Sequence, residues 1–124
     1  MKFKAVQKTN PQDRDAEKKW YAQIVTDGEV TIDMLVDEIE KFSALSEPDI
    51  RGVLIALENV VQKRLSEGKI VRFEQLGSLY PSLSSTPSDT QEEVSAANIQ
   101  TIRVNYRPGK RIMDAMKNAS KKKV

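Results

Sequence analysis

The stretch SEPDIRGVLIALENVVQKRLSEGKIVRFEQLGSL, residues 46–79, contains a long helical pattern followed by an alternating strand pattern. Ser46 suits a helix N-cap, Pro48 suits the first turn, and Gly68 suits the position just past the end. Between them, apolar residues recur every three or four positions: Ile50, Val53, Leu54, Leu57, Val60, Val61 and Leu65. This wide stripe predicts a helix that packs in a core or in a dimer interface.

The alternating residues after Gly68 predict two strand pieces joined near Leu76 and Gly77, where glycine permits a tight turn or a bulge. A third strand is predicted around residues 102–107, because Ile102, Val104 and Tyr106 alternate with Arg103, Asn105 and Arg107. One face of this strand is therefore apolar, and the other offers two guanidinium groups.

Shorter elements flank this region. Residues 3–8 and 20–25 alternate well enough to form two paired strands. Thr31 suits the N-cap of a short amphipathic helix that places its acidic residues, Asp33, Asp37 and Glu40, on a solvated face. Pro108 suits the first turn of a final helix whose inner face would comprise Ile112, Met113, Met116 and Ala119.

Composition limits the possible functions. The 124 residues are 39% hydrophobic and 31% charged, as expected for one globular α+β domain, and no apolar run approaches the roughly 20 residues of a membrane span. No secretory signal pattern opens the sequence, so we expect a cytoplasmic protein. Cysteine and histidine are both absent, which removes the usual thiol nucleophile, general base and metal ligands. We therefore expect no enzyme, no cofactor and no metal site.

A possible calcium loop is rejected on its residues. Asp13, Asp15 and Glu17 have the opening spacing of such a loop. However, its sixth position would be Lys18 instead of glycine and its twelfth Ile24 instead of glutamate.

Charge is distributed unevenly along the chain. The net charge is +2, but residues 99–124 carry eight basic and one acidic side chain, whereas residues 31–68 carry four and eight. The basic end predicts an anionic partner such as nucleic acid, although a solvated tail that aids solubility is the alternative.

The order of elements and several short motifs resemble the histone-like HU and integration host factor family of bacterial DNA-binding proteins. The matching residues are Leu45-Ser46, Glu67-Gly68, Val71, Phe73, Leu76-Gly77-Ser78-Leu79 and Tyr106-Arg107-Pro108-Gly109-Lys110. The resemblance implies an HU-like helical body with a small antiparallel sheet over residues 31–119. Residues 1–30 look like the extra N-terminal strands of a longer HU-related subgroup, and residues 120–124 would be a fraying basic tail.

The resemblance also implies a homodimer whose two β-ribbon arms reach around DNA, each with a proline that wedges between bases. Residues 82–98 occupy the place of the arm but contain three acidic residues, Asp89, Glu92 and Glu93, and no basic residue. Thr90 and Glu93 form a capping-box pattern, which favours a turn or two of helix. We expect a shortened, reshaped arm in which Pro87 is a turn proline, and we assign Asn10-Pro11-Gln12 to a loop.

The sequence thus predicts a nucleoid-associated protein that binds and condenses duplex DNA through phosphate contacts, without strong sequence specificity or sharp bending. The expected DNA-binding residues are Arg103, Arg107, Lys110, Arg111, Lys117, Lys121, Lys122 and Lys123. The alternative is an HU-fold scaffold that binds a protein through its N-terminal strands or residues 82–98. A membrane partner is not expected.

Overall fold

A computed structural model describes all residues, 1–124. The elements in chain order are β1 (Lys2–Lys8), β2 (Lys19–Val25), α1 (Ile32–Phe42), α2 (Glu47–Ser66), β3 (Val71–Arg72), the 3-10 turn η1 (Glu74–Leu76), β4 (Gly77–Ser85), the 3-10 turns η2 (Gln91–Glu93) and η3 (Ala96–Asn98), β5 (Ile99–Pro108), α3 (Lys110–Asn118) and β6 (Lys122–Lys123). The strands form two sheets of order β2-β1-β6 and β3-β4-β5. The predicted α+β class, with an HU-like helical body and extra N-terminal strands, is confirmed.

The two helices begin where their caps predict. The Thr31 hydroxyl oxygen accepts a hydrogen bond from the Met34 backbone N–H at 3.4 Å, and Ser46 accepts one from the Asp49 N–H, also at 3.4 Å. Gly68 adopts a φ of 80° just beyond α2, a left-handed conformation that glycine takes without strain. Local sequence therefore fixes both ends of the long helix.

A small core lies between α1 and α2. Val36 of α1 is 0% exposed and Ile50 of α2 is 3% exposed. At the edge of this contact, Arg51 forms ion pairs with Asp33 at 2.5 Å and with Glu47 at 3.2 Å. Arg51 thus ties the first turn of α1 to the first turn of α2.

Part of the apolar stripe of α2 remains uncovered by this chain. Val53 is 61% exposed, and Leu57 and Val60 are exposed as well. Only three of 124 residues are buried, far fewer than a domain of this length needs for a stable core. The chain alone therefore leaves its core incomplete.

The β3-β4-β5 sheet turns sharply at Gly77, as predicted. Gly77 has a φ of 119°, and a Cβ there would lie 2.9 Å from the Tyr106 ring. Gly109, which follows β5, is pressed against the backbone carbonyl of Gln75, so a side chain there would clash.

Pro108 ends β5 instead of opening α3, which makes the expected helix start wrong. Gly109 serves as the N-cap because Pro108 remains paired with Gly77.

Two 3-10 turns close the ribbon between β4 and β5, which confirms the expected helical turns. The capping box predicted from Thr90 and Glu93 is wrong, because η2 is only three residues long and Thr90 makes no side-chain cap. The box forms instead between Ser95 and Asn98, with the Ser95 N–H donating to the Asn98 Oδ1 at 2.8 Å. The Asn98 amide also donates to the Ser88 hydroxyl at 2.9 Å and therefore anchors the tip.

The last residues join the N-terminal strands. β1 and β2 pair antiparallel as predicted, and β6 adds to the free edge of β1 in parallel, with Lys122 beside Lys2. The expected fraying tail is therefore wrong. Ala119 ends α3 in an extended conformation, so the chain leaves the helix as a strand. The Met1 ammonium donates a hydrogen bond of 2.9 Å to the Ser120 carbonyl oxygen.

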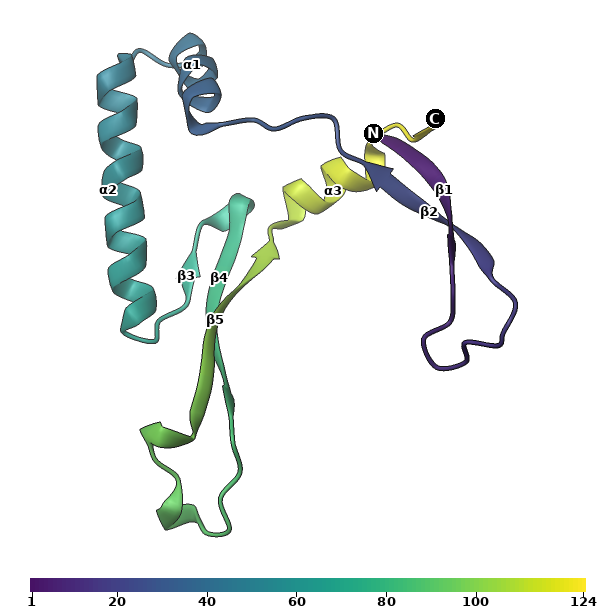
Figure 1. The fold of residues 1–124 in the computed structure, drawn as a ribbon. Coiled ribbons are helices and arrows are strands. Elements are labelled where there is room, and N and C mark those ends of the chain that lie inside the picture. The colour runs from purple at the N-terminus through teal and green to yellow at the C-terminus, as the bar shows by residue number, and fades with distance from the viewer.

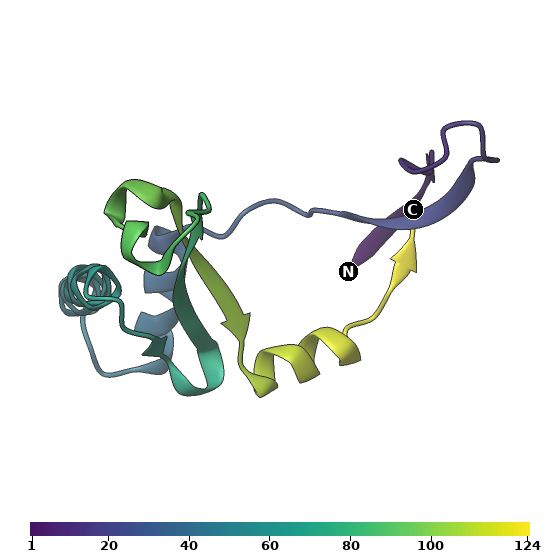
Figure 2. The same ribbon diagram turned by 90° about the horizontal axis from the view of Figure 1, so that it is seen from below.

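The two sheets lie apart in space. Figure 1 shows α1, α2 and the β3-β4-β5 sheet on one side and the β1-β2 hairpin on the other, with α3 between them. Figure 2 shows the same separation from below, with both chain ends in the N-terminal sheet. None of the helices has the length and apolar character to cross a membrane.

Candidate nucleic-acid interface

The β3-β4-β5 sheet has two chemically different faces. Side chains alternate along paired strands, and residues opposite one another share a face. One face is apolar and includes Leu79, Leu83, Ile102 and Tyr106. The other, which we call the arm face, comprises Arg72, Ser78, Tyr80, Ser82, Ser84, Thr101, Arg103, Asn105 and Arg107. The arm face carries three guanidinium groups and no carboxylate.

Two of these arginines flank one aromatic ring. The guanidinium carbon of Arg107 lies 5.0 Å from the centre of the Tyr80 ring, and that of Arg72 lies 5.8 Å away. Arg72 also donates a hydrogen bond of 3.3 Å to the Tyr80 hydroxyl. That bond, with the charges of both arginines, lowers the pKa of Tyr80 below its ordinary value of 10.0. Stacking on an aromatic ring favours the weakly hydrated guanidinium, so the cluster is held without an acidic partner.

Further along the ribbon the arm face is polar and uncharged except for Arg103. Asn105 donates to the Ser82 hydroxyl at 3.0 Å, and the hydroxyls of Ser84 and Thr101 lie 2.6 Å apart. Arg103 lies opposite Ser82 and takes part in none of the ion pairs of the chain. Its charge is therefore available to an external anion.

Lys110 extends this surface at the start of α3. It follows Gly109, the N-cap, which offers no side chain to the first turn. The backbone N–H groups there are of the kind that bind phosphate at helix N-termini. Because Gly109 is in close contact with Gln75, the start of α3 is fixed relative to Arg107 and the end of β5.

The structure divides the eight predicted DNA-binding residues into three groups. Arg103 and Arg107 lie on the arm face, and α3 carries Lys110, Arg111 and Lys117. The third group, Lys121, Lys122 and Lys123, lies beyond α3.

The third group has structural neighbours of its own. The Lys121 ammonium donates to the carbonyl oxygens of Lys117 at 3.2 Å and Ala119 at 3.3 Å, so it caps the end of α3. Lys122 and Lys123 belong to the N-terminal sheet and not to the arm face. Their DNA contacts stay a prediction.

Sequence reasoning missed Arg72 and Tyr80. Both lie in segments predicted as strands, and Arg72 alternates with Val71 and Phe73, which was a usable signal. What the pattern did not contain was the register. It sets Arg72 opposite Ser78, and Ser78 in turn lies opposite Arg107, so the two arginines share one row with Ser78 between them.

A pair of helices, α1 and α2, followed by a three-stranded sheet with a basic arm face defines an HU-type domain. The family model for an HU domain fused to wHTH, Ig, or Glycine-rich motif matches residues 1–123, and the chain belongs to this family. The predicted resemblance to HU proteins is thereby confirmed.

A solved structure shares the fold. The crystal structure of a candidate bacterial DNA-binding protein from Bacteroides vulgatus ATCC 8482 aligns with 99% of this chain at a TM-score of 0.69 and 18% sequence identity. The alignment covers 47% of that protein, so this chain spans about half its length. No curated protein sequence matches the chain significantly.

Proposed function

We propose that this protein binds duplex DNA through the arm face and the start of α3, by phosphate contacts that tolerate any sequence. One observation carries the proposal. The arm face contains three arginines and no acidic side chain, and two of these arginines, Arg72 and Arg107, are held against the Tyr80 ring. Guanidinium groups suit phosphate oxygens because their donors form a planar fork. The HU family and the description of the Bacteroides protein support the same class of partner.

The proposed binding includes no wedge. The tip of the ribbon carries Asp89, Glu92 and Glu93, which repel phosphate, and no basic residue. Asn98 ties this tip into 3-10 turns that differ from a simple hairpin end. We therefore infer DNA binding with little bending, in contrast to proteins that insert a side chain between base pairs.

We also propose that the protein acts as a homodimer. Val53, Leu57 and Val60 of the α2 stripe are exposed, and on the apolar face of the ribbon Ile102 is 72% exposed. Between them lies a cleft of about 620 Å³ lined in part by Leu65, Pro81 and Leu83. A second copy would cover these surfaces and complete the core that one chain lacks.

A homodimer of this kind would act on bacterial DNA in the cytoplasm as a nucleoid-associated, DNA-condensing protein with no catalytic role. The alternative function, a protein-binding scaffold, is favoured by one observation. Trp20 is 66% exposed on an apolar face of the N-terminal sheet that also contains Phe3 and Ile24.

The test is anisotropy of a labelled duplex titrated with protein at several salt concentrations, with light scattering to give the mass. We expect a dimer with steep salt dependence. The double variant Arg103→Gln/Arg107→Gln should reduce the slope of log K against log salt by about 1.8 for each subunit that contacts the DNA, two contacts at about 0.9 each. The control Lys41→Gln/Lys63→Gln removes the same charge from the helices and should leave the slope unchanged.

Absence of binding by the parent protein at low salt would contradict DNA binding and favour the scaffold. Equal slopes for the two double variants would contradict the assigned arm face.

A further inference from the structure

The N-terminal sheet, like the arm sheet, has one charged and one apolar face. Period-two alternation places Lys2, Lys4 and Lys8 of β1 on one side, and the register adds Lys19 and Tyr21 of β2. We call this side the lysine face. It contains no carboxylate, because the remaining β1 and β2 residues on it are Val6, Gln23 and Val25.

Like charges are directly adjacent on the lysine face. Lys8 lies opposite Lys19 across the β1-β2 pair, and Lys2 lies beside Lys122 across the β1-β6 pair. Like charges in such cross-strand positions destabilise a sheet. None of the ion pairs of the chain involves these four lysines. Their repulsion is therefore uncompensated within the protein, and a bound polyanion would relieve it.

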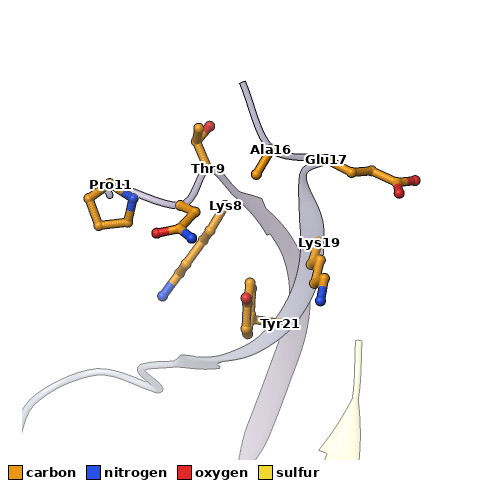
Figure 3. A pocket seen from close by; sticks show the side chains of 8 residues that line it. Lys8, Thr9, Pro11, Ala16, Glu17, Lys19 and Tyr21 are labelled. Carbon is orange, nitrogen blue, oxygen red and sulfur yellow. The ribbon is translucent and has the colours of Figure 1, made fainter. Parts of the chain in front are cut away.

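One end of the lysine face is built around an aromatic ring. The Lys8 ammonium lies 5.9 Å from the centre of the Tyr21 ring. Figure 3 shows Lys8 and Lys19 on either side of Tyr21, while Glu17 points away from them. The three residues line a cleft of about 430 Å³ between the strands and the loop that joins them. The wall of the cleft is about equally polar and apolar, and it contains two lysines against one carboxylate, Glu17, so its net charge favours an anionic group such as phosphate.

The spacing along β1 also suits a phosphate chain. Residues two apart on one face of a strand are separated by about 6.8 Å. Lys2 and Lys4 are therefore one such step apart and Lys4 and Lys8 two steps apart, with Val6 between them, so the row can follow a nucleic-acid strand by contacting some of its phosphates. Flexible ammonium groups in such a row contact phosphates as point charges and read no base.

We propose that the lysine face is a second DNA-binding surface that contacts the phosphates of duplex DNA independently of the arm face. The proposal rests on the proposed DNA binding for its class of partner but on none of the same residues. The lysine face belongs to another sheet, on the far side of α3 from the arm face (Figure 2). It therefore adds phosphate contacts without altering those of Arg103 and Arg107.

The experiment is lysine acetylation footprinting of the full chain with and without a 40-base-pair duplex, read by mass spectrometry. Bound DNA should slow acetylation of Lys4, Lys8 and Lys19 several-fold and leave Lys41 and Lys63 unchanged. In the anisotropy titration, Lys4→Gln/Lys8→Gln should reduce the salt slope by about 1.8 for each subunit that contacts the DNA, two contacts at about 0.9 each. The control Lys41→Gln/Lys63→Gln has the same net charge, and circular dichroism checks that both variants fold.

Three outcomes separate the two proposals. Protection of Lys4, Lys8 and Lys19 with a reduced slope supports the lysine face, even if the arm-face variant binds normally. Protection of Lys110 and Lys117 alone, with a slope equal to that of the control, overturns the lysine face and leaves the arm face standing. No binding and no protected lysine overturns both.

Discussion

The Tyr106 hydroxyl donates a hydrogen bond of 2.6 Å to the backbone carbonyl oxygen of Leu76, 30 residues earlier in the chain. This bond fastens β5 to the 3-10 turn η1 directly before Gly77. The Tyr106 ring also occupies the space that a side chain at Gly77 would need. The two motifs that resemble HU, around Leu76-Gly77 and Tyr106-Arg107, are therefore in direct contact and together set the base of the arm.

Loss of this bond should lower stability. We expect Tyr106→Phe to decrease the free energy of unfolding by about 1 kcal/mol, the usual net worth of one hydrogen bond. Tyr21→Phe is the control, because the Tyr21 hydroxyl makes no hydrogen bond within the chain. Denaturant titrations at one fixed protein concentration would measure both. Equal midpoints for the two variants would contradict a stabilising role for Tyr106.

Two glycines should respond to alanine in opposite directions. Gly109→Ala should destabilise the protein by more than about 1 kcal/mol, because the new Cβ would meet the Gln75 carbonyl. Gly52→Ala should stabilise it by about 0.5–1 kcal/mol, since Gly52 lies inside α2 in open space. Melting temperatures measured side by side at matched protein concentration would check the signs.

The Tyr80 hydroxyl provides a pH-dependent test of the arm face. Because the pKa of Tyr80 is lower in the folded protein than in the unfolded chain, the ionised form stabilises the fold. This contribution is present above about pH 10, the ordinary pKa, and is lost as the pH falls through the lower folded value. Arg72→Gln should raise the pKa of Tyr80 toward 10.0, as measured by NMR titration of the 13C-labelled ring. An unchanged pKa would contradict the Arg72 contact.

The tip of the ribbon should depend on one amide side chain. Asn98→Ala removes the bonds to the Ser95 N–H and the Ser88 hydroxyl. We expect faster hydrogen exchange confined to residues 86–98 and little change in the global midpoint, because the tip is exposed and remote from α1 and α2. Asn59→Ala, on the polar side of α2, is the control. Protection that persists in the Asn98 variant would show that backbone pairing alone orders the tip.

The incomplete core makes folding and dimer formation inseparable. Leu57→Asp places a charge on the exposed α2 stripe and should yield monomers that lose most helical signal in circular dichroism. Gln62→Asp places the same charge on α2 outside the apolar stripe and should leave the dimer intact. A folded Leu57→Asp monomer would contradict the proposed interface.

Sequence patterns predicted the parts of the fold that depend on neighbouring residues. Caps at Thr31 and Ser46, the helical stripe of α2 and the turn at Gly77 are all local, and each is where the sequence places it. The strand β6 was missed because two residues carry no periodicity and their partners lie near residue 2. Pro108 was misplaced because its pairing with Gly77, a distant contact, outweighed its suitability for a helix start.

In the candidate site, too, local patterns placed some residues and missed those that depend on distant contacts. The alternation in β5 was enough to place Arg103 and Arg107 on one face. The contribution of Arg72 depends on the register between β3 and β4, and the pairing of Lys8 with Lys19 depends on how a ten-residue loop aligns two strands. Sequence spacing specifies neither register.

The parallel strand β6 also dictates an order of events during synthesis. β1 and β2 leave the ribosome before β6, because Lys122 and Lys123 follow Lys2 by some 120 residues. An isolated two-stranded hairpin is only marginally stable in water, and closing so long a loop carries an entropic cost. The nascent hairpin must therefore wait with the outer edge of β1 unpaired until α3 has folded and delivers β6 to it, so strands made early belong to a sheet that is completed late.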